Sequence, residues 1–180
     1  KQICRCIIRS GVDISWVCSI YPLQADENLS EIMAQAGCTE INLSFESGSE
    51  KILENMNKKF TTRDVEKSAA VFRKQGIKQT GFMLLGGPGE TQKTVEETLA
   101  FTESLELDTV NLTLGMRIYP GTVLSRIAVE KGVITKDNNL LQPTFYLERG
   151  LEDWIFDRTA SWLMGKPEWR CAALTETAQE

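Results

Sequence analysis

The feature of this sequence that most constrains its fold is a repeat of short apolar runs, each followed by a turn and a helix-like segment. The repeat recurs about every 30 residues, which is the size of a βαβ unit. The apolar runs, which we predict to be strands, are residues 14–20, 40–45, 79–85 and 110–114. Mostly apolar strands that alternate with helices form parallel sheets with helices on at least one face. The sequence therefore predicts an α/β fold.

Helix signals fill the segments between these runs. Asp26 or Asn28 can cap one helix and Thr61 another, and Gly76 is a stop signal. The predicted helices are residues 1–10, 26–36, 49–53, 61–75, 91–106, 120–131 and 151–164. The last of these is amphipathic, and we expect it to close an open side of the sheet. Residues 143–146 are predicted to be irregular, and the polar last ten residues to be frayed.

The composition suits a single globular domain. The chain has 180 residues, of which 42% are hydrophobic, and this is enough for a sizeable core. Its net charge of −5 is spread along the sequence, so we expect neither a nucleic-acid partner nor a membrane surface. The chain begins at Lys1 within a predicted helix, and we therefore expect it to be part of a longer protein.

Cysteine and histidine usage narrows the chemistry further. The spacings of the 5 cysteines match no common set of zinc ligands, so no metal site is predicted on this chain. We expect reduced structural thiols and a cytoplasmic protein. Histidine is absent, which removes imidazole as a metal ligand and as a general acid or base.

Small and polar residues follow three of the predicted strands, in the segments 44–49, 86–91 and 115–117. Ligands of parallel α/β folds bind at the carboxyl ends of the strands, so these segments predict one shared site. The second segment is Gly86–Gly87–Pro88–Gly89 followed by Glu90–Thr91. Its glycines allow backbone to approach a ligand closely, and the following helix has free N–H groups at its start.

Three sequence motifs together resemble the radical S-adenosylmethionine enzymes. The first is Phe45–Glu46–Ser47–Gly48–Ser49, followed by Leu53 and Met56–Asn57–Lys58. The second is Gly86–Gly87–Pro88–Gly89–Glu90–Thr91 with Thr94 and Glu97–Thr98, and the third is Tyr119–Pro120–Gly121–Thr122. Their order and spacing match over roughly residues 12–147. The chain looks most like the branch that often carries a cobalamin-binding domain and includes oxidative-cyclase-like and methyltransferase members.

The resemblance implies a partial (β/α) barrel of the TIM-barrel type, with about four parallel strands. Residues 1–147 would form this barrel without its first strands, and residues 148–180 a C-terminal helical extension. It also implies S-adenosylmethionine and a [4Fe-4S] cluster as cofactors of the parent enzyme. The cluster cleaves S-adenosylmethionine to a 5′-deoxyadenosyl radical, which takes hydrogen from a small-molecule substrate. The parent would be an oxidoreductase or a methyltransferase, and the use of cobalamin stays open.

The same resemblance assigns residues to the cofactor. Glu46 and Ser47 would approach its ribose or methionine part. The strand through Leu84 and Leu85 would pack on adenine. The cofactor-binding residues that we expect are Glu46, Ser47, Leu84, Leu85, Gly86, Gly87, Met116 and Arg117. No catalytic residue is predicted.

The sequence departs from the family in one respect. The family holds its cluster with three cysteines in the pattern C-x-x-x-C-x-x-C, and this pattern does not occur here. We expect it to lie upstream of Lys1. The chain alone would then be inactive and bind none of these cofactors, and its missing strands would leave a sheet edge open to self-association.

Three other readings stay open. Gly87–Thr94 fits a nucleotide phosphate loop, except that Gln92 replaces the second glycine. A (β/α) module that binds phosphate without redox chemistry is the second reading. The third is an interaction domain whose surface uses the aromatic residues Phe145, Tyr146, Trp154, Phe156, Trp162 and Trp169.

Overall fold

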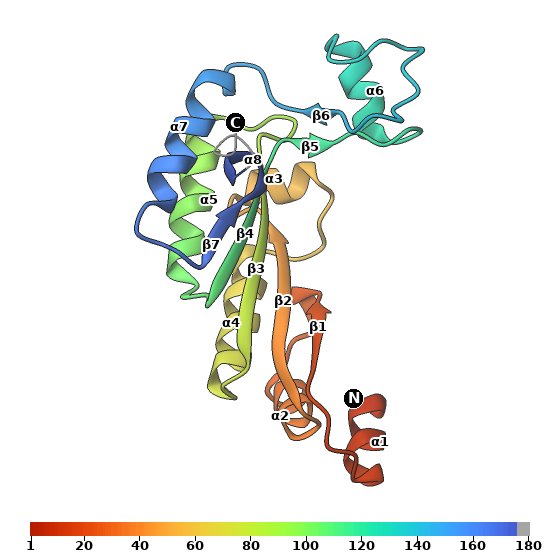
Figure 1. The fold of residues 1–180 in the computed structure, drawn as a ribbon, viewed down its shortest axis with the longest axis vertical. Coiled ribbons are helices and arrows are strands. Elements are labelled where there is room, and N and C mark those ends of the chain that lie inside the picture. Colours follow the sequence, from red (N-terminus) through yellow and green to blue (C-terminus); the bar gives the residue numbers. More distant parts are fainter. Residues whose placement is uncertain (176–180) are drawn as a thin grey trace.

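A computed structural model describes residues 1–175 of the chain, and its centre is a parallel sheet. The sheet has 5 strands in the order β1-β2-β3-β4-β7, and each neighbouring pair is parallel (Figure 1). Its strands are β1 (Trp16–Ile20), β2 (Cys38–Glu46), β3 (Lys78–Leu85), β4 (Thr109–Leu114) and β7 (Trp169–Cys171). This confirms the predicted α/β fold, with one strand more than expected.

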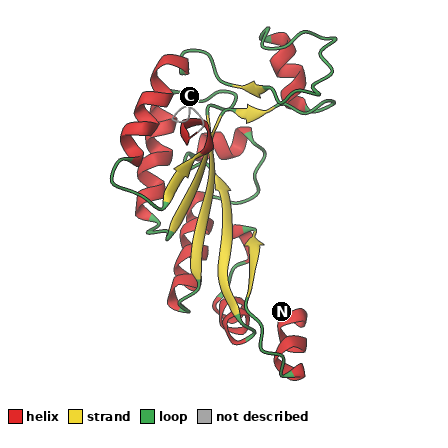
Figure 2. Ribbon diagram, viewed as in Figure 1, coloured by secondary structure: helices red, strands yellow, loops and turns green. Residues whose placement is uncertain are grey.

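The larger helices lie on one face of this sheet, so the chain forms an open, partial barrel (Figures 1 and 2). The helices are α1 (Gln2–Ser10), η1 (Pro22–Gln24), α2 (Glu27–Gln35), α3 (Glu50–Asn55), α4 (Thr62–Lys74), α5 (Gln92–Ser104), α6 (Val123–Glu130), α7 (Glu152–Leu163) and α8 (Ala172–Thr175). Side chains of Asp26, Thr61, Thr91 and Thr122 cap four of them by accepting backbone N–H bonds. In the described part of the chain, no helix has the length and hydropathy needed to cross a bilayer.

The core forms between the sheet and these helices because side chains alternate along each strand. On β2, Leu43 and Phe45 are fully buried, and on β3 Met83 and Leu85 are buried beside them. Leu99 of α5 and the apolar face of α7 cover this layer. Burial of this shared layer is what holds the strands and the helices together.

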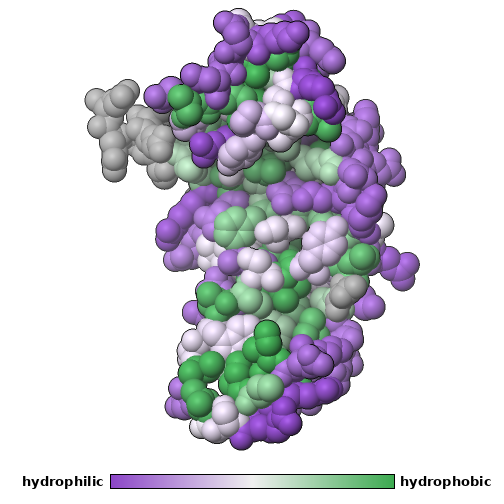
Figure 3. Space-filling model, turned by 90° about the vertical axis from the view of Figure 1, so that its right-hand side faces the viewer, coloured by the Kyte–Doolittle hydropathy of each residue, from purple (hydrophilic) through white to green (hydrophobic). Residues whose placement is uncertain are grey.

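The opposite face of the sheet carries the other half of each strand, and none of the larger helices in residues 1–175 covers it. Ser44 of β2 lies beside Phe82 of β3, which in turn lies beside Asn111 of β4. These side chains are half-buried. Figure 3 views the molecule from this side, where green and pale side chains run down the middle and purple ones gather at the borders. We call this surface the open face.

A small separate unit extends from the carboxyl-terminal end of β4. It consists of β5 (Met116–Arg117), helix α6 and β6 (Phe145–Tyr146), and β5 pairs with β6 in antiparallel fashion. Its own apolar core includes Ile118, Ala128 and Tyr146. In Figure 1 this unit projects sideways beyond the strand ends. We call residues 116–146 the α6 lobe.

Two predictions about the C-terminal third were wrong. Residues 143–146 are not irregular throughout, because Phe145 and Tyr146 form β6. The last residues are not all frayed, because β7 pairs with Val110–Leu112 of β4 and α8 follows it. Hence the C-terminal extension is not helical alone. Residues 176–180, which were also predicted to be frayed, lie outside the described residues.

Candidate functional site

The carboxyl-terminal ends of β2, β3 and β4 lie side by side, as the sequence predicts. At the end of β2, Glu46 has a φ of 66°, which is rare for any residue other than glycine. The N–H of Ser47 donates to the carbonyl of Phe45 at 2.8 Å, which closes a tight turn around Glu46. Such strained residues persist where the surrounding structure requires them, and they cluster at functional sites.

The carboxylate of Glu46 is half-buried and held by one cation. Lys58, in the loop between α3 and α4, donates to Glu46 Oε1 at 3.2 Å. The same ammonium lies 5.9 Å from the centre of the Phe60 ring. Glu46 is therefore a charged group with a defined orientation at the edge of the open face.

Ser47, in contrast, points into the protein. Its side chain is fully buried, and its Oγ lies 2.9 Å from Oγ1 of Thr98 on α5. The same Oγ accepts the N–H of Ser49 at 3.1 Å. The hydroxyl of Ser47 is thus used inside the structure.

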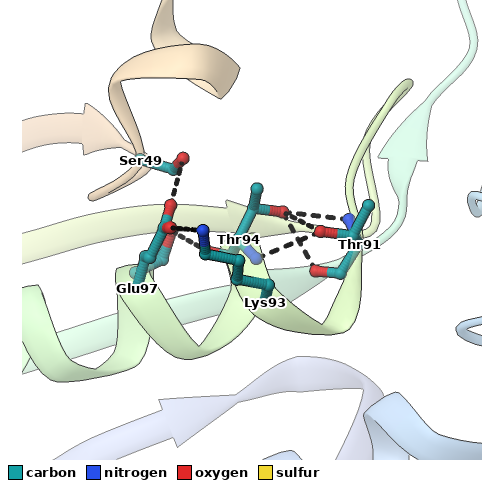
Figure 4. Close-up of polar contacts among 6 residues, drawn as sticks. Ser49, Thr91, Lys93, Thr94 and Glu97 are labelled. Atoms are coloured by element: carbon teal, nitrogen blue, oxygen red, sulfur yellow. Dashed lines mark hydrogen bonds and ion pairs between the residues drawn. The ribbon is translucent and has the colours of Figure 1, made fainter.

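Helix α3 is tied to α5 by a second set of polar contacts (Figure 4). The Oγ of Ser49 donates to Glu97 Oε2 at 2.6 Å, and Lys93 lies 3.8 Å from Oε1 of the same residue. Thr91 and Thr94 form a capping box at the start of α5. These bonds fix the segment after β2 relative to the segment after β3.

The glycine-rich loop after β3 is closed by a carboxylate of its own. Glu90 Oε2 accepts the N–H groups of both Gly86 and Gly87. The N–H of Gly89 donates to Glu148 Oε2 at 2.6 Å, and Pro88 has no N–H to offer. Since these donors already have acceptors, the geometry argues against a phosphate bound in this loop. Lys93, the lysine of the phosphate-loop reading, is exposed on α5.

Glu90 is almost fully buried, and its Oε1 has no hydrogen-bond partner among the described residues. Burial raises the pKa of Glu90 to about 7, although the N–H donors of Gly87 and Gly86 act in the opposite direction. The charge state of the group that organises this loop therefore changes close to neutral pH.

The backbone conformation requires glycine at Gly86, and side chains of the protein fill the space beside Gly86 and Gly87. Gly86 has a φ of 89°, and a Cβ at this position would collide with Leu147 Cδ1. A Cβ at Gly87 would lie 2.8 Å from the sulfur of Met116. We expected Gly86 to let a cofactor approach, and in the structure the approaching group is a side chain of the protein itself.

Leu84 and Leu85 project to opposite faces of the sheet. Leu85 is fully buried in the core under the helices, whereas Leu84 is half-buried on the open face. Of the two, Leu84 alone offers its side chain to a ligand on that face.

The α6 lobe brings Met116 and Arg117 to the same end of the sheet. Met116 is half-buried and lines a pocket of about 340 Å³, together with Pro88, residues 55–57 at the end of α3 and Val123 of α6. We call this the rim pocket. Arg117 is exposed and lies 5.0 Å from the ring centre of Tyr119. Arg117 has no ion-pair partner within residues 1–175.

Cys4, Cys18 and Cys38 lie in one apolar cluster, in which the Cys18 and Cys38 thiols interact, whereas Cys171 belongs to the main core. Cys4, Cys38 and Cys171 are buried, Cys18 is half-buried and Cys6 is exposed. Within the described residues, no group of three or more cysteine or carboxylate side chains could hold a metal ion. The residues present therefore do not fit the ligand set of an iron–sulfur cluster.

Sequence reasoning missed Glu148, which accepts the Gly89 N–H from a position 59 residues away. It also missed the role of Thr98 as the partner of Ser47. Neither position carries a local signal, because both contacts depend on how distant segments pack. The aromatic residues proposed for an interaction surface do not all lie on the surface. Tyr146 and Trp162 are buried, while Phe145 and Phe156 are exposed.

Comparisons with known proteins bear on this site. Residues 2–102 match the family model of the radical SAM superfamily. The chain is 30% identical over 132 residues to an uncharacterized methyltransferase of Pyrococcus horikoshii, covering 73% of this chain and 28% of that protein. It is 32% identical over 94 residues to the tRNA-2-methylthio-N(6)-dimethylallyladenosine synthase of Clostridium novyi, covering 49% of this chain and 20% of the synthase.

A solved structure is similar over most of the length of this chain. It is the radical S-adenosylmethionine methyltransferase TsrM from Kitasatospora setae, with cobalamin and a [4Fe-4S] cluster bound. The two are 25% identical, with a TM-score of 0.63 over 72% of this chain and 25% of TsrM. The chain thus spans about a quarter of the length of these three proteins.

Proposed function

Because this chain belongs to the radical SAM superfamily, we propose that it is part of an enzyme that binds S-adenosylmethionine at the ends of β2, β3 and β4. Members of this family use S-adenosylmethionine and a [4Fe-4S] cluster, which together supply reductive cleavage of the sulfonium. The observation that carries the proposal is the half-buried carboxylate of Glu46 at the end of β2, next to β3, whose Leu84 is half-buried on the open face.

The side chains at this end suit an adenosine. A nucleoside needs an apolar surface for its base and hydrogen-bond partners for its hydroxyl groups. Leu84 and Met116 offer the apolar surface, and Glu46 Oε2 offers an acceptor that has no partner within the described residues. Gly86 and Gly87 shape the wall behind these groups through backbone, and Arg117 offers a cation at the outer edge. Ser47 and Leu85 support the wall from the core.

The cluster itself does not fit the described residues, so we propose that its cysteine ligands lie elsewhere in the whole protein. The chain by itself would then hold part of the S-adenosylmethionine site and be inactive. Methyl transfer is the favoured reaction, because the Pyrococcus relative and TsrM are both named methyltransferases. An oxidoreductase is the alternative. We propose a small molecule as substrate, and whether cobalamin takes part depends on segments outside these residues.

The test uses the whole protein, reconstituted anaerobically with iron and sulfide and then reduced. We expect it to convert S-adenosylmethionine to 5′-deoxyadenosine and methionine, or to S-adenosylhomocysteine if it transfers the methyl group. Both sets of products are quantified by mass spectrometry. Absence of all these products, with a full complement of cluster iron, would disprove the proposal.

A matched pair of variants locates the site. Glu46→Gln removes the charge at the end of β2, whereas Glu54→Gln makes the same change on the exposed side of α3. We expect Glu46→Gln to weaken binding of S-adenosylmethionine about tenfold, which corresponds to the loss of one charge-assisted hydrogen bond. Glu54→Gln should bind S-adenosylmethionine with the same affinity as the unchanged protein. Equal affinities for the two variants would move the site away from β2.

The outer edge of β1 has no strand beside it in the described structure. Unpaired edges offer N–H and C=O groups to another strand. We propose that the isolated chain self-associates through this edge. Sedimentation at several concentrations tests it, and a monomer at all of them would refute it.

A further inference from the structure

Glu148 joins the two parts of the structure that surround the rim pocket. Its carboxylate is buried, and its Oε2 accepts the N–H of Gly89 at 2.6 Å and the hydroxyl of Tyr146 at 2.9 Å. Its Oε1 accepts Lys131 Nζ at 2.6 Å. Gly89 belongs to the loop after β3, whereas Tyr146 and Lys131 belong to the α6 lobe. One carboxylate thus links both.

The neighbouring backbone strengthens this link. The N–H of Glu148 donates to the carbonyl of Gly86 at 2.9 Å, and the side chain of Leu147 fills the space above Gly86. The segment 146–148 therefore holds the loop from the lobe side. Glu90 holds the same loop from within, through the N–H groups of Gly86 and Gly87.

The lobe end of the link is packed into the core of the lobe. Tyr146 is fully buried in the apolar core of the α6 lobe, and its hydroxyl is therefore fixed in position. Lys131 directly follows α6, and its ammonium lies 5.8 Å from the Tyr146 ring centre. Movement of α6 would consequently be transmitted to Glu148.

An ionised carboxylate suits these contacts better than any uncharged side chain. All the groups that hydrogen-bond to it within the described residues are donors: the N–H groups of Gly89 and Arg149, a hydroxyl and an ammonium. Burial alone would raise the pKa of Glu148, but the bonds from Lys131, Gly89 and Tyr146 outweigh it and the pKa lies below its ordinary value. A glutamine would turn an NH₂ group toward one of these donors.

We propose that Glu148 is a positioning residue that ties the α6 lobe to the Gly86–Glu90 loop and so sets the width of the rim pocket. Val123 and Ile127 of α6 form one wall of that pocket, and Pro88 of the loop forms another. The effect on the cofactor rests on the proposed function. The mechanical link between lobe and loop does not.

The experiment compares four variants of the whole protein. Glu148→Gln and Lys131→Met break the link from its two sides. Glu130→Gln and Lys136→Met make the same chemical changes at exposed positions of the lobe that form no ion pair within residues 1–175. Two properties are measured: deuterium exchange of the peptide that covers residues 83–91, and the steady-state constants for cleavage of S-adenosylmethionine.

We expect Glu148→Gln to speed exchange at the Gly89 amide about tenfold and to raise KM for S-adenosylmethionine about tenfold, while kcat stays within about twofold. Lys131→Met should produce the same pattern to a smaller degree, and the two exposed variants should match the unchanged protein. A residue that mattered only for folding would lower the active fraction, and hence kcat, without raising KM.

The outcomes separate the two proposals. Unchanged exchange in Glu148→Gln would overturn the link between lobe and loop. Faster exchange with an unchanged KM, in a protein that cleaves S-adenosylmethionine, would overturn the effect on the pocket alone. A reconstituted protein without any cleavage, but with faster exchange in this variant, would overturn the proposed function and leave the link supported.

Discussion

The hydroxyl oxygens of Ser47 and Thr98 lie 2.9 Å apart in the protein interior, although 51 positions separate the two residues in the chain. The bond joins the turn after β2 to the middle of α5. The N–H of Gly48 also donates to Thr98 Oγ1, at 3.1 Å. The segment that follows Glu46 is therefore anchored to the helix behind the sheet, whereas the half-buried Glu46 carboxylate stays accessible at the strand end.

We predict that Ser47→Ala lowers the free energy of unfolding by about 1–3 kcal/mol, because it leaves buried polar groups without a partner. Urea unfolding of the purified protein measures this. Ser161→Ala, on the exposed side of α7, serves as the control and should change stability by less than about 0.5 kcal/mol. If Ser47→Ala instead impaired cofactor binding at full stability, Ser47 would contact the ligand as the sequence suggested.

A second prediction concerns the pH dependence of stability. The pKa of Glu90 rises from 4.5 to about 7 through burial, so the folded protein holds this proton more tightly than the unfolded chain does. The stabilisation that this provides is complete below about pH 4.5 and is lost as the pH rises to about 7. Relative to Glu90→Gln, the unchanged protein should lose at most about 3 kcal/mol across this range.

Urea unfolding of both proteins at several pH values between 4 and 8 checks the expected divergence. Glu54→Gln, which alters an exposed carboxylate, should follow the unchanged protein throughout. Parallel stability curves for the unchanged protein and Glu90→Gln would show that the buried carboxyl group titrates normally.

A third prediction compares two glycines in the core. A Cβ at Gly48 would collide with the Cβ of Phe101, and this atom cannot move unless the α5 backbone moves with it. A Cβ at Gly81 would lie 2.5 Å from Leu107 Cδ1, the far end of a flexible side chain. We therefore expect Gly48→Ala to lower the free energy of unfolding by about 1–3 kcal/mol, and Gly81→Ala to lower it less. Urea unfolding of the two variants measures both changes. The reverse order would mean that α5 yields more easily than Leu107.

A fourth prediction concerns thiol reactivity. Cys6 is exposed on α1, whereas Cys4 and Cys171 are buried, and burial raises the pKa of Cys38 to about 12. The thiolate is the reactive form, so alkylation of the folded protein at pH 8 should modify Cys6 first. Peptide mass spectrometry identifies the site. Early modification of Cys38 would indicate that the packing around β1 and β2 opens readily.

Local sequence patterns were enough for most elements of the first two thirds of the chain. The capping threonines Thr61 and Thr91 begin α4 and α5 where they were predicted, and the apolar run at residues 79–85 is β3. Caps and alternation act over a few residues, so they can be read without knowledge of the fold. Strands β6 and β7 are short, and they are strands because β5 and β4 pair with them.

By itself, the sequence determined which strand ends carry the candidate site, since local patterns predict the strands and the glycine-rich turns that follow them. The tertiary structure decided what each side chain there does. Leu84 and Leu85 are neighbours that face opposite sides of the sheet, and the N–H groups of Gly86 and Gly87 bind Glu90. Gly89 binds Glu148, which is distant in sequence. The physical reason is that a hydrogen bond or a packing contact depends on distance in space, which sequence separation does not define.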